Sequence, residues 1–173
     1  FDMYLKCIND ILRIYAERED VERITSLKEE LQDLALKEDF VLTPYAHYTL
    51  GLCSVYKGQA ENALDYFQKA LALSLQAEGK EDMCYALTGL AVTYLYIGKY
   101  QEALKKINNL KIFFEILPQH ELKISSQILN GIILRKMHRF DQALDILWGC
   151  YELLKFEKSH HLYMHVLYAI GVT

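Results

Sequence analysis

The sequence contains few residues that interrupt helices. Its 173 residues include 8 glycines and only 2 prolines, which is about half the usual share of these two residue types. Because glycine and proline dominate turns and loops, their scarcity favours long helices over many short strands. The composition therefore predicts an all-α fold.

Long apolar runs and a strong excess of one charge are also missing. The uncharged stretch over residues 83–98 is shorter than the roughly 20 apolar residues that a membrane span requires. The chain carries 19 Lys and Arg against 23 Asp and Glu, a net charge of −4. A dedicated nucleic-acid binder needs a basic surface instead. We therefore expect no membrane segment and no direct contact with nucleic acid.

The cysteines show no disulfide framework. There are four of them, far apart in the sequence and without a CxxC pair: Cys7, Cys53, Cys84 and Cys150. In helical segments a free cysteine usually behaves as a small buried apolar residue. We expect this role for all four, and a reducing, cytoplasmic setting.

Motifs for catalysis and cofactor binding are absent. The sequence contains no GxGxxG, no phosphate-binding GxxxxGK[ST] and no GxSxG, so no phosphate cradle or activated serine is indicated. His161 and His165 stand four residues apart, a spacing that can bind metal on a helix. No Glu lies between them and no third ligand is evident, so we interpret them as part of a polar helix face. We expect no enzyme activity, no cofactor and no metal.

Small residues recur along the chain at a fixed interval. One set steps by 40 residues through Gly51, Ala91 and Gly131, and a second set steps by 40 residues through Ala63, Ala103 and Ala143. Self-similarity at such a period is the signature of a repeat protein. Small side chains in phase allow the two helices of one repeat to approach closely.

Each repeat is predicted to contain two helices. Apolar residues recur at helical spacing before and after a turn, and Gly58 suits the left-handed position at a helix end. His138 occupies the corresponding position in the third repeat, which is tolerable because His reaches positive φ more readily than most residues. The helices are expected over residues 45–57, 60–76, 82–97, 100–116, 121–137, 140–157 and 161–173.

The repeats define the domain organisation. Residues 1–40 keep the period but lack its small residues, which predicts a divergent N-terminal helical hairpin, either a degenerate repeat or a cap. Residues 41–173 are expected to hold three full units and the first helix of a further one, so the chain is expected to be a fragment of a longer protein. Solenoids need end caps. The apolar face of the last helix therefore allows self-association.

The repeat motif resembles the tetratricopeptide repeat (TPR) family. The first unit reads Gly51…Gly58-x-Ala60-x-x-Ala63-x-x-x-Phe67-x-x-Ala70, and the second reads Leu90-Ala91-x-x-Tyr94-x-x-x-Gly98-x-Tyr100-x-x-Ala103. The usual family unit has about 34 residues. The longer period is similar to the long-helix variants in kinesin light chain, Pins-type adaptors and Rap-type regulators. The resemblance implies an α-solenoid of antiparallel helix pairs that forms a right-handed superhelix.

The resemblance also implies a peptide-binding groove lined by the first helix of each unit. Transferring the groove positions by register gives an aromatic surface that ends in a basic patch: Tyr45, Tyr48, Tyr56, Tyr85, Tyr96, Arg135, Lys136, His165 and Tyr168. Tyrosine supplies rigid contact area with a polar tip, and arginine pairs with carboxylates. The alternative is that these tyrosines only pack the repeats together.

Charge changes along the array. Residues 1–40 carry 6 basic and 11 acidic side chains, whereas residues 99–173 carry 10 basic and 7 acidic ones. Such an asymmetry would steer an acidic partner to the C-terminal units. The alternative is an ordinary solvated surface with no selected gradient.

Two functions fit these observations. The first is a non-enzymatic scaffold that binds a peptide or helix of another protein in the groove. The alternative is a sensor or regulatory segment of a larger signalling or transcription-regulating protein, in which small rotations accumulate from unit to unit.

Overall fold

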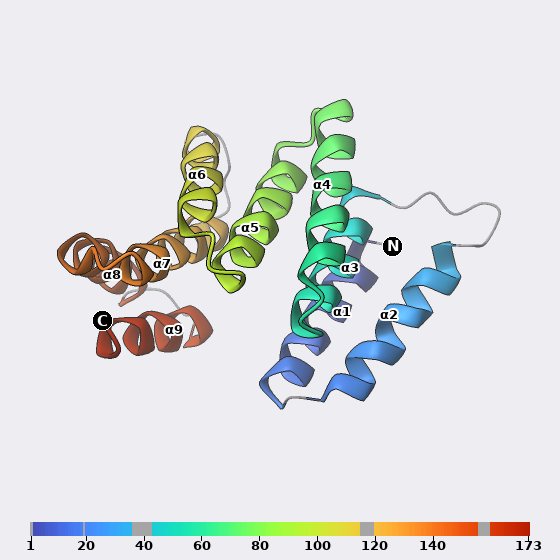
Figure 1. The fold of residues 1–173 in the computed structure, drawn as a ribbon, viewed down its shortest axis with the longest axis horizontal. Helices are drawn as coiled ribbons and strands as arrows, with labels where there is room; N and C mark the ends of the chain where they lie inside the picture. Colours follow the sequence, from blue (N-terminus) through green and yellow to red (C-terminus); the bar gives the residue numbers. More distant parts are fainter. Residues whose placement is uncertain (1, 19, 36–42, 115–119, 156–159) are drawn as a thin grey trace. The chain divides into compact units, whose positions relative to one another are not determined.

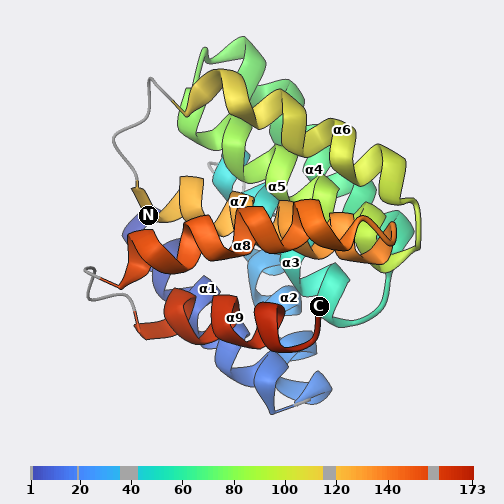
Figure 2. The same ribbon diagram turned by 90° about the vertical axis from the view of Figure 1, so that its left-hand side faces the viewer.

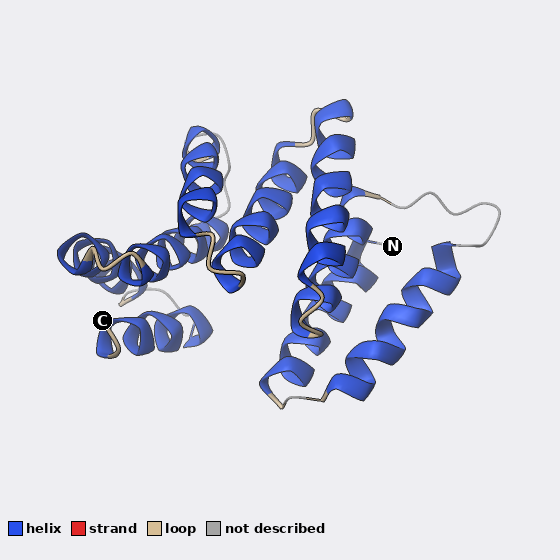
Figure 3. Cartoon of the chain, in the orientation of Figure 1, coloured by secondary structure: helices blue, strands red, loops and turns tan. Residues whose placement is uncertain are grey.

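The computed structural model describes residues 2–18, 20–35, 43–114, 120–155 and 160–173. Helices account for almost all of these residues, and no strand occurs among them (Figure 3). The helices are α1 (Asp2–Glu17), α2 (Val21–Ala35), α3 (Pro44–Tyr56), α4 (Ala60–Gln76), α5 (Lys80–Tyr96), α6 (Tyr100–Leu110), the 3-10 turn η1 (Lys111–Phe113), α7 (His120–Lys136), α8 (Phe140–Leu154) and α9 (His160–Gly171). In the described ranges, no helix is long and apolar enough to cross a bilayer.

The chain forms two compact units, Phe1–Thr93 and Tyr94–Thr173. In the first unit α3 pairs with α4, and α1 and α2 pack against α3 (Figure 1). In the second unit α7 pairs with α8, and α9 packs against both of them (Figure 2). Antiparallel helix pairs that follow one another in sequence order are the construction of an α-solenoid, so the predicted fold class is confirmed. The expected domain boundary at residue 40 lies outside the described residues.

The helix bounds agree with the repeat, except at two ends. Helix α4 has the predicted bounds, and α3, α5, α7 and α9 begin one or two residues earlier than expected. The helix predicted over 100–116 is wrong at its end, because α6 stops at Leu110 and the chain continues as the 3-10 turn η1. Phe113 and Phe114 have low helix propensity, and Pro118 blocks continuation. Helix α8 likewise ends at Leu154, before the expected residue 157.

The turns inside the repeats have the predicted left-handed backbone. Gly58 has φ 69°, Gly98 has φ 75° and His138 has φ 59°. In the link between α4 and α5, Glu78 takes the left-handed conformation (φ 54°) rather than the neighbouring Gly79. Glycine is thus not required at each turn, although it adopts the left-handed conformation at the lowest energetic cost.

The core of the first unit is apolar and lies between α1, α2 and α3. Its buried residues are Ile8, Leu12, Ile24, Leu31, Ala46, Leu50 and Cys53. Next to it the ring of Phe67 on α4 is completely buried. This ring lies against Gly51 of α3 and Gly89 of α5. The small residue at 51 therefore permits the close helix approach that the repeat predicted.

The second unit repeats this packing with aliphatic side chains. Its buried core comes from α7, α8 and α9 and contains Ile124, Ile128, Leu147, Cys150, Leu154, Val166 and Ala169. A Cβ added to Gly131 would stand 2.7 Å from Cγ of Leu147. The positions Gly51 and Gly131 therefore have the same role in their units.

The cysteines are all free, and three of the four are buried. Burial raises the pKa of the Cys53 thiol to about 12 and that of Cys84 and Cys150 to about 11. These thiols stay protonated and fill space as small apolar groups. The expectation was wrong for Cys7, which is exposed on α1.

Candidate peptide-binding surface

The predicted groove residues of the first unit form an aromatic cluster. The Tyr45 and Tyr48 rings of α3 have centroids 5.6 Å apart, and the Tyr85 ring of α5 lies 5.2 Å from each of them. All three side chains are partly buried. Rings at these separations stabilise one another beyond the area that they bury. The cluster therefore holds the first helices of neighbouring repeats together.

Tyr48 is the most deeply placed member of this cluster. Its ring centroid lies 5.7 Å from that of Phe67, next to the repeat core. Burial raises the pKa of the Tyr48 hydroxyl, and the neighbouring phenols of Tyr45 and Tyr56 add to the rise. Burial likewise raises the pKa of Tyr85, with Tyr45 as the next cause. Both hydroxyls are neutral over the physiological pH range and present no anion to a partner.

The predicted groove residues of the second unit are more accessible. Tyr96, at the end of α5, is 73% exposed, and Tyr168 on α9 is 70% exposed. Lys136 at the end of α7 and His165 on α9 are exposed as well. Large aromatic side chains at such exposure offer contact area to a partner.

Arg135 links two helices of the second unit. Its Nη1 donates a hydrogen bond to the backbone carbonyl oxygen of Val172, 3.1 Å away, beyond the end of α9. The guanidinium group has five N–H donors in all. This bond joins the end of α7 to the end of α9, the helix that also carries His165 and Tyr168.

The two histidines that the sequence assigns to a polar helix face are His161 and His165. The side chain of His161 lies outside the described residues, and His165 is exposed on α9. Among the side chains that the structure describes, no group of three His, Cys, Asp or Glu residues could hold a metal ion.

Sequence reasoning missed a buried lysine in the first unit. Lys28 on α2 is only 7% exposed. Its Nζ donates to Ser54 Oγ at 3.1 Å and to Gln59 Oε1 at 3.0 Å. Burial lowers the pKa of this ammonium group, and the charge of Lys57 lowers it further. Lysines are rarely buried without a carboxylate, so no sequence signal pointed to this position.

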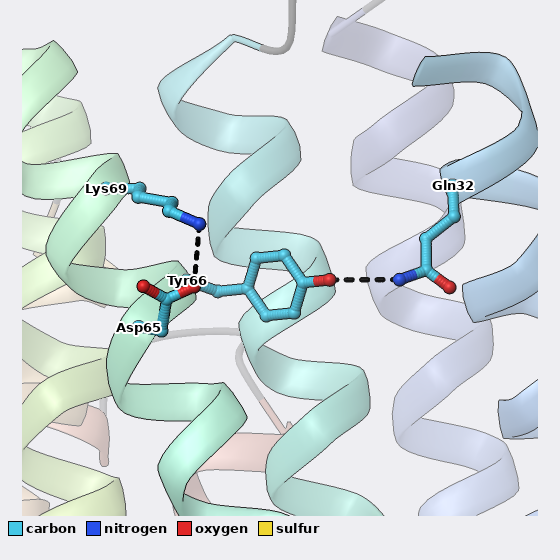
Figure 4. Close-up of polar contacts among 4 residues, drawn as sticks. All are labelled: Gln32, Asp65, Tyr66 and Lys69. Carbon is cyan, nitrogen blue, oxygen red and sulfur yellow. Dashed lines mark hydrogen bonds and ion pairs between the residues drawn. The ribbon is translucent and has the colours of Figure 1, made fainter. Parts of the chain in front are cut away.

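Tyr66 on α4 covers this lysine. The Lys28 Nζ lies 5.6 Å from the centroid of the Tyr66 ring, within the range of a cation–π contact. The Tyr66 hydroxyl accepts a 3.0 Å hydrogen bond from Gln32 Nε2 of α2, as Figure 4 shows. On the same helix Lys69 pairs with Asp65 at 2.7 Å. Side chains of α2 and α4 therefore contact each other directly.

His47 on α3 lies beside the same tyrosine. The two ring centroids are 6.2 Å apart. Its Nδ1 is buried and has no hydrogen-bond partner. Burial lowers the pKa of the imidazole, and the charge of Lys69 lowers it further. His47 is therefore neutral at physiological pH and packs as an aromatic residue.

Comparisons with known proteins agree with this architecture. A protein-family model described as tetratricopeptide repeat matches residues 42–107. The crystal structure of nearly identical TPR-like repeats of a putative kinesin light chain from Podosopora anserina superimposes with a TM-score of 0.68. The two sequences are 17% identical, and the match covers 98% of this chain and 84% of that chain. No curated protein sequence matches this chain.

A second solved structure shows the same fold at lower similarity. The protein MamA (AMB-1) superimposes with a TM-score of 0.52 at 19% identity, over 99% of this chain and 85% of that chain. Likeness at such identity concerns the fold alone. Residues 42–107 of this chain match the tetratricopeptide-repeat family model, and the chain shares the fold of solved TPR-like repeats.

Proposed function

We propose that this chain is a non-enzymatic protein-interaction scaffold that binds a peptide or helix of a partner protein on its first-helix surface. The observation that carries the proposal is the exposure of two aromatic side chains of the second unit, Tyr96 and Tyr168. Aromatic residues and arginine are the types that dominate binding energy in interfaces. We call Tyr96, Arg135, Lys136, His165 and Tyr168 the second-unit surface.

Charge favours an acidic partner for this surface. Residues 99–173 contain 10 basic and 7 acidic side chains, although the whole chain is acidic. Arg135 retains N–H donors beyond the one that bonds Val172, and Lys136 is exposed. A carboxylate of a partner would find complementary charge here, which raises the rate of association.

The first unit has a different role in the proposal. Tyr45, Tyr48 and Tyr85 pack on one another, so their rings are held in place before a partner arrives. Preorganised aromatic surface loses little entropy on binding. Their partial burial makes them a rigid apolar platform rather than the main contact.

The remaining expectations extend the proposal. We assign residues 1–40 to a divergent hairpin that covers α3 and residues 41–173 to the array, because α1 and α2 pack on α3. The buried free cysteines favour a cytoplasmic location.

Self-association through α9 is the other interaction that we infer. Met164, Leu167 and Val172 expose apolar surface on or next to this helix, and a second copy could cover it. A sedimentation coefficient that rises with protein concentration would support this inference, and a concentration-independent monomer would contradict it.

Variants of the second-unit surface test the main proposal. Short random peptides are selected from a display library on the whole chain, and their affinities are measured by fluorescence anisotropy. The triple variant Tyr96→Ala, Lys136→Glu, Tyr168→Ala should weaken binding about tenfold or more, which equals about 1.4 kcal/mol. All three side chains are exposed, so the helical circular dichroism should not change.

A matched control places similar changes on the second helices. Lys105 on α6 and Trp148 on α8 are also exposed, and Lys105→Glu with Trp148→Ala should leave affinity unchanged. Equal loss in both variants, or loss only in the control, would contradict a first-helix site.

A further inference from the structure

The second unit contains an open groove between its second helices. It lies between α6 and α8, has α7 as its floor, and has a volume of about 440 Å³. Leu134 and Ile146 contribute apolar surface, and Asn108, Asn130 and Gln142 contribute side-chain amides. This volume is in the range of small-ligand sites. The groove does not include any residue of the second-unit surface.

An unsatisfied buried acceptor belongs to Asn130, a residue that lines this groove. Asn130 is only 5% exposed, and its Oδ1 has no hydrogen-bond partner. The corresponding residues one and two periods earlier are Leu90 and Leu50, so an amide stands at an apolar core position. A buried acceptor without a donor is unfavourable. A ligand that brings an N–H group would supply what Asn130 lacks.

The first unit shows how such a groove is closed. Two periods before Asn108 stands Lys28, and two periods before Ile146 stands Tyr66. Lys28 crosses from α2 to Ser54 on α3 and lies under the Tyr66 ring. The corresponding side chains in the second unit are shorter, because Asn has replaced Lys and Ile has replaced Tyr. Their replacement explains why the groove between α6 and α8 is open.

The charges around the groove disfavour a cation, and the acceptor of Asn130 disfavours an anion. Lys111 and Arg139 line the groove, together with the single carboxylate of Asp145. An ammonium group would meet two cations. A carboxylate would be attracted by these cations, but it has no proton to donate to Asn130. A carboxamide is neutral and offers both N–H donors and a carbonyl acceptor. Its methylene groups would pack on Leu134 and Ile146.

We propose that the groove between α6 and α8 is a second peptide site that takes a Gln or Asn side chain of a partner. The buried Asn130 amide turns toward the groove so that its Oδ1 accepts from the carboxamide, which in turn accepts from the amides or the guanidinium group at the rim. This site is separate from the second-unit surface and does not depend on it. Each of the two proposed sites is therefore tested by its own variants.

The test closes the groove with residues that the first unit already uses. Asn108→Lys with Ile146→Tyr reproduces the side chains of Lys28 and Tyr66. Peptides from the random library that bind through the groove should carry Gln or Asn at one fixed position. Their affinity should fall about tenfold or more in this double variant, and equally when the Gln or Asn is replaced by Leu or Glu. Asn109→Lys, an exposed neighbour outside the groove, is the control for charge and should leave affinity unchanged.

A second variant guards against misfolding of the first. Asn130→Leu removes the unsatisfied acceptor and restores the residue type of the other repeats, so the melting temperature should rise while binding falls about tenfold. The proposal is overturned if no peptide is selected, because the groove then holds only water. It is also overturned if every peptide keeps its affinity in both variants, or if the recognised side chain is charged. Peptides sensitive only to Tyr96→Ala, Lys136→Glu, Tyr168→Ala would support the first-helix site and overturn this one.

Discussion

The ring of Phe67 lies against the bare Cα of Gly51, so that a Cβ added to Gly51 would stand 2.5 Å from Phe67 Cε1. Real Cβ atoms do not approach a ring carbon this closely, and Gly89 of α5 lies just as close to the same ring atoms. Phe67 is completely buried. The spacing of α3 and α5 around α4 is therefore set by one aromatic ring and two glycines.

Replacing Gly51 should destabilise the first unit. Gly51→Ala forces Phe67 out of position, and overpacking of this kind costs about 1–3 kcal/mol of unfolding free energy. Gly149 is a matched control, since it also lies inside a helix, α8, with nothing within 4 Å of an added Cβ. Gly149→Ala should gain about 0.5–1 kcal/mol, because alanine is the better helix former. Urea unfolding measures both values, and a stabilised Gly51→Ala would refute the packing described.

The alanine positions of the repeat should be equally intolerant of size. Ala63 on α4 is completely buried, so Ala63→Leu should lower the free energy of unfolding by about 1–3 kcal/mol. Ala72 on the same helix is exposed, and Ala72→Leu should change it by less than about 0.5 kcal/mol. Thermal melts followed by circular dichroism compare the pair. Equal melting temperatures would show that the register of the repeat is wrong.

The buried Lys28 should make stability depend on pH. Its pKa is lowered from the ordinary 10.5 by burial. Between the lowered folded value and 10.5, the unfolded chain binds more protons than the folded chain, so stability due to Lys28 rises with pH. Lys28→Met removes this dependence. The difference in unfolding free energy, wild type minus variant, should increase as the pH is raised from neutral toward the ordinary lysine pKa.

Urea titrations of both proteins at several pH values measure this difference. Lys105→Met, at an exposed position, serves as the control and should show no such trend. A difference that is flat, or that falls with rising pH, would mean that Lys28 is not buried as a cation.

Much of the fold could be predicted because the repeat constrains it many times over. The left-handed turns at Gly58, Gly98 and His138 follow from one period, and so does the small residue at Gly131. The end of α6 could not be predicted from the period, because the corresponding helices α4 and α8 continue for four or more residues past the position equivalent to Leu110.

The site was less accessible to sequence reasoning than the fold. The repeat register predicted both Tyr48 and Tyr96 as groove residues. In the structure Tyr48 packs beside Phe67, whereas Tyr96 is largely exposed. Exposure depends on which neighbouring helix covers a position, and the period does not carry this information. The burial of Lys28 and Asn130 was not predicted, because a polar residue on a helix normally faces solvent.

The footprint of a bound peptide tests the central claim most directly. Backbone amide chemical shifts of the whole chain are recorded with and without a selected peptide whose affinity is unchanged by Asn108→Lys with Ile146→Tyr. We expect the largest changes at Tyr96, Lys136 and Tyr168, on the first helices of the second unit. Changes confined to α6 and α8, or to exposed positions of the second helices such as Lys105 and Trp148, would contradict a scaffold that binds its partners on the first-helix surface.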